Sequence, residues 1–299
     1  MKRSVLSIFL ILLILFASSC AHTSYDEDIQ IIATNFPSYD LSRAVAGDFA
    51  TVRMLLPFGA QDHSYEPSAK DIVDISGCDL FVYVGGESDK WVEDILASVS
   101  PSIKTLKLVD LVDELHIHSH SGEEKYDEHV WTSPRNAINI CKKIADTLSE
   151  IDPANKQNYE RSSAAYISEL ETLDAEFEAF FASGFDKPLV FGDRFPFAHF
   201  ANEYRVEYYS AFPGCAEETE PGMADVAKII DIVKQKNIST IFYIEFSNQN
   251  TAEAIAEATG ASTALLHSAH NVSKEEFEAG VTYLSIMQNN LETLKGSFE

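Results

Sequence analysis

Cysteine is scarce in this chain of 299 residues, which contains only four. Cys20, Cys78, Cys141 and Cys215 lie far apart, and no two have the Cys-x-x-Cys spacing of a zinc or redox site. The three that follow Cys20 are an odd number, which excludes a full disulfide framework. Cys78 and Cys141 occur in stretches with apolar periodicity, so we expect both to be buried free thiols.

Basic residues are also few, with 22 Lys and Arg against 47 Asp and Glu, a formal net charge of −25. This balance argues against a nucleic-acid partner, because phosphates would be repelled. It suits a protein that attracts cations, and it equally suits a solvated acidic surface with no such role. Hydrophobic residues make up 45% of the chain, enough for one large core or two ordinary ones, and the length favours two lobes.

Long apolar runs are missing except at the amino terminus. Lys2 and Arg3 precede an apolar run over residues 5–16, and small residues then lead to Cys20. The run is shorter than the roughly 20 residues that span a bilayer, which favours a lipoprotein signal peptide over a transmembrane anchor. We therefore expect Cys20 to be acylated and the protein to be extracytoplasmic, anchored to the cell membrane as a lipoprotein.

The rest of the chain alternates short strand-like runs with helical stretches, which predicts an α/β fold. The predicted strands are 29–34, 51–56, 80–84, 104–107, 189–191, 207–209, 240–244 and 262–266. The predicted helices are 39–46, 68–76, 90–98, 136–151, 154–183, 197–203, 222–235, 251–259 and 274–294. The stretch 154–183 lacks glycine and proline and predicts one long helix.

This pattern predicts two lobes, each a βα-alternating parallel sheet with flanking helices, joined by a long linker helix. The expected boundaries are a signal peptide over 1–19, an amino-terminal lobe over 20–153, the linker helix over 154–184 and a carboxyl-terminal lobe over 185–299. Parallel sheets carry ligand loops at the carboxyl ends of their strands, so a cleft between the lobes would bring these loops face to face.

Histidines recur on such loops. His63 lies on a polar turn after a strand-like run, His129 follows Asp127-Glu128, and His267 and His270 follow the last predicted strand. A lone loop histidine is usually an ordinary surface residue, but several on opposed lobes favour a metal site.

Several segments together resemble the zinc/manganese substrate-binding lipoproteins of ABC metal importers, of the cluster A-I type. They are the lipoprotein signal, the loop 59–67, the segment 128–131 after a histidine-rich stretch, the long linker helix, and the segments 244–246 and 252–260. The resemblance covers nearly the whole mature chain. It implies a bilobal receptor that holds one divalent transition metal between its lobes and passes it to an ABC permease in the membrane.

The resemblance also implies the metal ligands. His63 and His129 match the two ligands of the amino-terminal lobe. In the carboxyl-terminal lobe, Asp193 is the chemically sensible match; a shift of one residue would put Arg194 there, which cannot ligate, and His199 is the runner-up. His267 matches the last ligand, with His270 as the alternative three residues on.

Three imidazoles and one carboxylate favour Zn(II) as the transported ligand over Mn(II), which prefers more oxygen donors. Glu245 and Glu220 are expected to orient the ligating imidazoles by accepting hydrogen bonds from their N–H groups. His116, His118 and His120 predict an exposed, mobile loop that binds metal loosely, or a solvated loop without function.

Two other functional classes are compatible with the sequence. A zinc hydrolase would use three protein ligands and a general base such as Glu245, but the chain has no HExxH helix and its candidate ligands are dispersed. An adhesin-like surface lipoprotein could bind metal incidentally. We expect a monomeric receptor that is not an enzyme.

Overall fold

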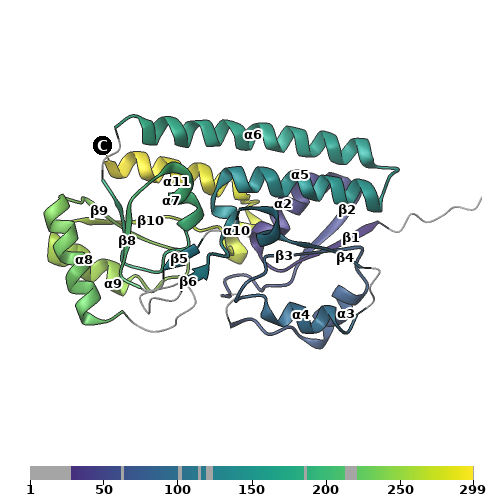
Figure 1. Cartoon of the computed structure of the whole chain (residues 1–299), viewed down its shortest axis with the longest axis horizontal. Coiled ribbons are helices and arrows are strands. Elements are labelled where there is room, and N and C mark those ends of the chain that lie inside the picture. Colours follow the sequence, from purple (N-terminus) through teal and green to yellow (C-terminus); the bar gives the residue numbers. More distant parts are fainter. Residues whose placement is uncertain are drawn as a thin grey trace, which may run out of the picture.

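The computed structural model describes residues 28–61, 64–99, 103–113, 116–118, 124–184, 187–212 and 221–298. Two four-stranded parallel sheets lie in separate lobes, with helices packed around each sheet (Figure 1). The predicted α/β class is confirmed.

The amino-terminal sheet has the strand order β2-β1-β3-β4. Its strands are β1 (Ile29–Ala33), β2 (Ala50–Met54), β3 (Leu80–Tyr83) and β4 (Lys104–Lys107). The connecting elements are α2 (Phe36–Ala46), η1 (Gly47–Phe49), α3 (Ala69–Ser76), α4 (Lys90–Leu96) and η3 (Leu108–Leu111). The turn at Ser68 opens α3 as predicted, because Ser68 and Asp71 form a capping box that satisfies two backbone donors.

The carboxyl-terminal sheet has the order β10-β9-β7-β8. Its strands are β7 (Leu189–Phe191), β8 (Tyr208–Ser210), β9 (Thr240–Tyr243) and β10 (Ser262–Leu265), and its helices are α7 (Ala198–Tyr204), α8 (Met223–Lys236) and α9 (Asn250–Thr259). Gly192 follows β7 where a Cβ atom would lie 2.3 Å from the Cα of Ala252. This close approach lets α9 pack directly on the loop that carries Asp193 and Arg194.

A helical layer runs along one side of both lobes. It contains α5 (Pro134–Ile151), the 27-residue helix α6 (Lys156–Ala182) and α11 (Tyr283–Phe298), and α6 extends over both sheets in Figure 1. At 1.5 Å per residue α6 is about 40 Å long. It contacts α2 and α5 from one lobe and α7 and α11 from the other side, so it braces the two lobes.

One hydrophobic cluster of the described residues extends across both lobes, beside a smaller separate cluster within each lobe. It joins Ile31 and Val82 of the first sheet to Phe191 and Phe242 of the second through buried residues such as Trp131. Hydrogen bonds also cross between the lobes, from Trp131 Nε1 to the Ser268 carbonyl at 2.8 Å, and from Asn271 Nδ2 to the carbonyls of Pro57 and Ala60 at 2.7 and 2.8 Å. The loops between the lobes are therefore held in fixed positions.

Two expectations about local structure are wrong. The single helix predicted over 274–294 is two helices, α10 (Lys274–Glu278) and α11. Gly280 adopts φ +78 between them, a left-handed conformation that ends α10. The histidine-rich loop contains an antiparallel strand pair, β5 (His116–His118) with β6 (Glu124–Tyr126), followed by η4 (Val130–Thr132).

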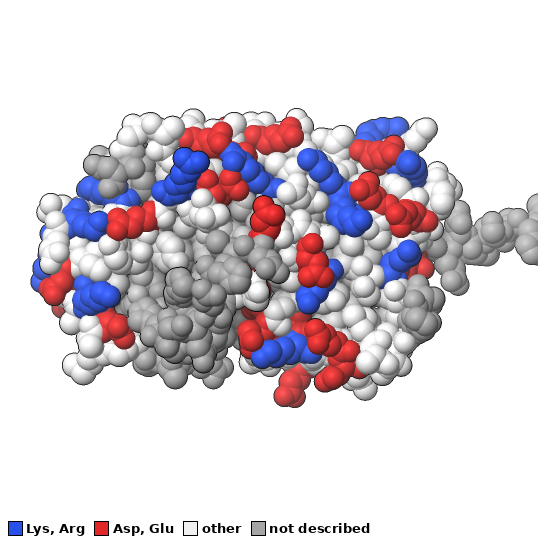
Figure 2. Space-filling view, viewed as in Figure 1, with Lys and Arg blue, Asp and Glu red and all other residues white. Residues whose placement is uncertain are grey.

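The thiols of Cys78 and Cys141 are buried and free, as predicted, whereas Cys215 lies outside the described residues. Within the described ranges no helix is both long enough and apolar enough to cross a bilayer. Among the described residues, acidic and basic side chains are interspersed over the face drawn in Figure 2.

Candidate metal centre

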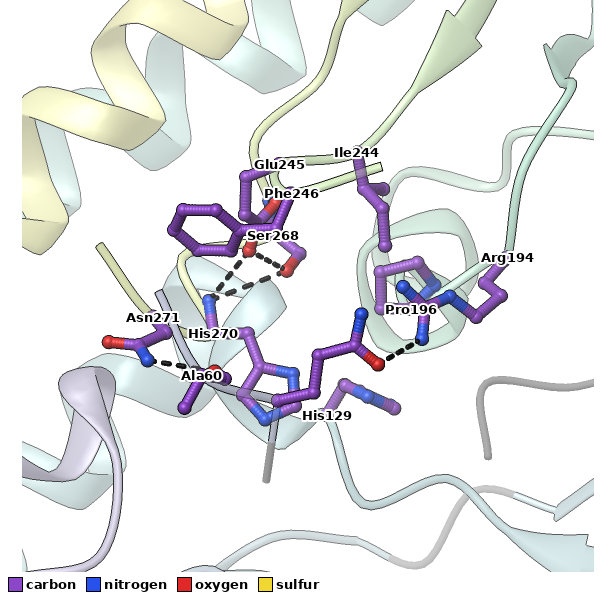
Figure 3. A pocket seen from close by; sticks show the side chains of 11 residues that line it. Ala60, His129, Arg194, Pro196, Ile244, Glu245, Phe246, Ser268, His270 and Asn271 are labelled. Atoms are coloured by element: carbon purple, nitrogen blue, oxygen red, sulfur yellow. Dashed lines mark hydrogen bonds between the residues drawn. The ribbon is translucent and has the colours of Figure 1, made fainter. Parts of the chain in front are cut away.

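A small cavity of about 30 Å³ lies where loops of the two lobes meet (Figure 3). The amino-terminal lobe contributes the loop after β2 and the segment before η4, and the carboxyl-terminal lobe contributes the loops after β7, β9 and β10. The lining residues are Ala60, Gln61, His129, Arg194, Pro196, Ile244, Glu245, Phe246, Ser268, His270 and Asn271. The loops after β2, β7, β9 and β10 follow the carboxyl ends of parallel strands, where α/β folds bind their ligands.

His129 is 3% exposed and held in a defined orientation. Its backbone N–H donates to Asp127 Oδ1 at 2.7 Å, and its ring Nδ1 lies 3.0 Å from the same oxygen. Because an ionised carboxylate only accepts, the ring proton is on Nδ1 and the lone pair is on Nε2. A carboxylate behind the imidazole in this way is typical of metal-ligating histidines.

His270 meets His129 in this pocket. Their ring centroids are 5.6 Å apart with an interplanar angle of 79°, and the ring centroid of Trp131 lies within 5.4 Å of both. Thus the structure brings together His129 and the residue that sequence analysis kept as the alternative to His267.

Glu245 fixes the loop that carries His270. Its carboxylate accepts hydrogen bonds from the backbone N–H of Ser268 at 2.7 Å, from the Ser268 hydroxyl, and from the backbone N–H of His270 at 3.2 Å. Burial alone would raise the pKa of Glu245, but the adjacent His267 and the hydrogen bonds from Ser268 outweigh burial and lower that pKa. Glu245 therefore supports the pocket through the backbone of the loop.

His267 does not line the pocket. Its Nδ1 accepts the backbone N–H of Ala269 at 2.9 Å, and its own backbone is held by the Asn290 side chain. An imidazole whose Nδ1 accepts carries its proton on Nε2, and this Nε2 is buried without a hydrogen-bond partner among the described residues. In this arrangement the lone pair of the ring is used by the backbone.

Asp193 also lies outside the pocket lining, and its carboxylate serves backbone groups. Its Oδ1 accepts from the Arg194 N–H at 2.7 Å and its Oδ2 accepts from the Ile244 N–H at 3.3 Å. The neighbouring Arg194 points toward the pocket instead and donates to Gln61 Oε1 at 3.0 Å across the lobe boundary (Figure 3).

His199 is likewise engaged in structural contacts. Its Nε2 donates to the Asp127 carbonyl at 3.0 Å, and its Nδ1 accepts from Asn136 Nδ2 at 3.2 Å. Both ring nitrogens have partners, so His199 ties α7 to the segment that carries His129.

Several predicted site residues cannot be placed. His63, His120, Glu220 and Cys20 lie outside the described residues, and His116 and His118 are described only as backbone in β5. Within the described part of the chain, no three His, Cys, Asp or Glu side chains gather closely enough to hold an ion by themselves.

Sequence reasoning did not single out Gln61 and Asn271, whose side chains form hydrogen bonds between the lobes, and it treated Arg194 only as the result of a shifted register. Asn271 could have been noticed, because Asn is favoured in turns, where its side chain hydrogen-bonds to backbone groups. Gln61 gives no such signal, since its contact with Arg194 depends on how the two lobes meet.

Comparison with known proteins gives a consistent result. The family model "Zinc-uptake complex component A periplasmic" matches residues 31–297. The zinc-binding lipoprotein AdcA of Streptococcus pneumoniae R6 is 32% identical over 294 residues, which cover 94% of this chain and 58% of that protein. The high-affinity zinc uptake system protein ZnuA of Bacillus subtilis is 30% identical over 285 residues, covering 92% and 89%.

Solved structures show the same fold. The crystal structure of the Zn(II)-bound ZnuA-like domain of S. pneumoniae AdcA superposes with a TM-score of 0.77 at 31% identity, covering 90% of this chain and 98% of that one. The chain spans only 58% to 61% of the length of the AdcA relatives it matches.

Proposed function

We propose a function for this chain from its family, that of the periplasmic component A of zinc-uptake complexes, to which it belongs. In this proposal it is an extracytoplasmic receptor that captures Zn(II) between its lobes and delivers it to an ABC permease. The relatives AdcA and ZnuA are named as zinc-binding and zinc-uptake proteins. For this chain, the proposal is supported by the proximity of the His129 and His270 rings in the pocket.

The spacing of these two imidazoles suits a shared ion. With Zn–N bonds of about 2.1 Å and a tetrahedral angle, two ligating imidazoles have ring centroids about 5 Å apart. The rings of His129 and His270 are 5.6 Å apart, close to that value. A small movement of either side chain would let both hold one zinc ion.

His63 is the third proposed donor. Gln61 lines the pocket, and His63 follows it by two positions in the sequence. We assign the donor of the last loop to His270 in place of His267, because the lone pair of the His267 ring is used by the Ala269 N–H. Asp193 becomes a supporting residue, because both of its oxygens accept backbone hydrogen bonds.

The hydrogen bonds that Glu245 accepts favour metal capture over catalysis. Glu245 is the carboxylate among the described pocket residues, and it accepts two hydrogen bonds from the loop backbone and one from the Ser268 hydroxyl. A general base must reach a water molecule on the metal. The engaged carboxylate of Glu245 suits a rigid binding site better.

The remaining assignments follow from the same proposal. Cys20 would carry the lipid that anchors the receptor near its permease, and residues 20–153, 154–184 and 185–299 would form the two lobes and the connecting helix. The histidines at 116, 118 and 120 would add weak metal binding, so deletion of residues 114–125 would remove weak sites and leave the tight one.

Chelator competition on protein lacking residues 1–20 tests the proposal. We expect one tight zinc, and a loss of affinity of at least 10- to 100-fold in His270→Ala, because a lost ligand costs no less than a lost supporting residue. His267→Ala is the matched comparison and should keep the one-zinc stoichiometry. Unchanged affinity in a His129→Ala/His270→Ala double variant would overturn the assignment.

A further inference from the structure

Arg194 places a permanent positive charge in the pocket that holds the two imidazoles. Its side chain is 16% exposed and comes from the loop after β7 (Figure 3). A guanidinium has no lone pair to offer a metal and stays protonated. Its presence beside His129 and His270 is therefore unexpected if the pocket holds a cation alone.

Most N–H donors of the Arg194 guanidinium have no acceptor within the described ranges. Of its five N–H groups, one donates to an acceptor within the described ranges, the neutral amide oxygen of Gln61 at 3.0 Å. Among the described residues, Asp193 forms an ion pair with Arg194, but its Oδ1 lies 3.8 Å from Nε, too far for a hydrogen bond, and both of its oxygens already accept backbone N–H groups. Arg194 can therefore bind an additional acceptor in the pocket.

Zinc bound as proposed above would have a coordination position to fill. It takes four donors in a tetrahedron, and the described pocket residues supply two imidazoles, those of His129 and His270. Even with His63 as a third donor, one ligand would come from solution. An anion in that position would lie between Zn(II) and the guanidinium and reduce the repulsion between these two positive charges.

From this we infer that the pocket is a joint site for Zn(II) and a small carboxylate-type anion, such as bicarbonate or acetate, with Arg194 holding the anion. The planar fork of a guanidinium matches the two oxygens of a carboxylate, and such charge-assisted pairs are among the stronger hydrogen bonds in proteins. This inference rests on the proposed zinc site. It adds that this receptor binds zinc together with an anion.

Zinc affinity measured by chelator competition, with and without 10 mM sodium bicarbonate or sodium acetate at an ionic strength held constant with sodium perchlorate, tests the inference. We expect either anion to raise the affinity of the wild-type protein about tenfold. We also expect it to change the visible absorption of the Co(II)-loaded protein, since the coordination shell changes. Arg194→Gln should lose both responses, and Arg194→Lys should keep part of them because it retains the charge.

Arg161→Gln is the matched control, because it removes an exposed arginine of α6 outside the pocket lining, and it should respond like the wild type. Tight zinc binding by the wild type with no effect of either anion would overturn this inference and leave the proposed function standing. An equal anion response in Arg194→Gln would also overturn it. Failure of the wild type to bind zinc under any of these conditions would overturn the proposed function as well.

Discussion

His267 and His270 lie three positions apart on one loop, and their hydrogen bonds decide which ring can bind a cation. The ring of His270 faces His129 in the pocket, whereas Nδ1 of His267 accepts the N–H of Ala269. Ala269 has φ +60, a backbone conformation that is unfavourable for a residue with a Cβ atom. The His267 ring therefore stabilises the bend that turns His270 into the pocket.

His267→Ala should lower the free energy of unfolding by about 1–3 kcal/mol, because it leaves the buried N–H of Ala269 without its acceptor. Urea denaturation of the metal-free protein measures this change. The variant should still bind one zinc ion, more weakly because the bend is less well fixed. A variant of unchanged stability that binds no zinc would instead identify His267 as a ligand.

The pKa of Glu245 predicts how the stability of the fold depends on pH. This pKa is lowered in the folded protein, where His267 and Ser268 outweigh the effect of burial. A depressed pKa means that the carboxylate stabilises the fold above the ordinary glutamate pKa of about 4.3, and that this contribution is lost as pH falls through the folded value.

Glu245→Gln should therefore destabilise the metal-free protein by about 1–3 kcal/mol at pH 7, because its amide NH₂ would face the N–H groups that the carboxylate now accepts. The gap between wild type and variant should narrow as pH is lowered below about 4. Urea denaturation at a series of pH values measures the gap, and a gap that widens at low pH would contradict this account.

Among the secondary-structure elements, the sequence pattern predicted most strands and helices close to their observed bounds. Strands such as β4 and β7 are short runs between turn residues, and α6 is a long stretch without helix breakers. The predicted helix over 274–294 is wrong because the interruption at Gly280 was outweighed by the apolar periodicity on both sides.

The site was harder to predict than the fold because its residues lie on irregular loops. Strand and helix periodicity indicates which way a side chain points, but it does not apply where Phe246 and Ala269 adopt left-handed conformations. The sequence could therefore narrow the last histidine to His267 or His270 without choosing between them. In the same way, a shift of one residue in the register decided whether Asp193 or Arg194 matched the ligand position of the carboxyl-terminal lobe.

The break between α10 and α11 gives a prediction with a matched control. Gly280→Ala should destabilise the protein by about 1 kcal/mol, because alanine disfavours φ +78 even though nothing lies within 4 Å of an added Cβ. Gly296→Ala, inside α11 and equally open, should instead stabilise it by about 0.5–1 kcal/mol. Thermal denaturation of both variants measures the two signs, and equal signs would contradict the left-handed break.

At the level of the whole molecule, one hydrophobic cluster contains buried residues of both lobes, so the lobes should unfold together. Proteins with two independent domains commonly show more than one transition. The hydrophobic cluster that joins both sheets, and the hydrogen bonds of Trp131 and Asn271 across the boundary, couple the lobes here.

Calorimetry of metal-free protein lacking residues 1–20 should therefore show one transition whose calorimetric and van't Hoff enthalpies agree. Two resolved transitions, or a calorimetric enthalpy well above the van't Hoff value, would show that the lobes unfold separately.

According to the proposed function, one zinc ion binds between the lobes at His129 and His270. Anomalous diffraction at the zinc absorption edge, from crystals grown with one equivalent of zinc, would locate this ion. We expect a single peak in the pocket, about 2.1 Å from a ring nitrogen of His129 and of His270. A peak coordinated by His267 or Asp193 in place of His270, or the absence of a peak between the lobes, would contradict the account.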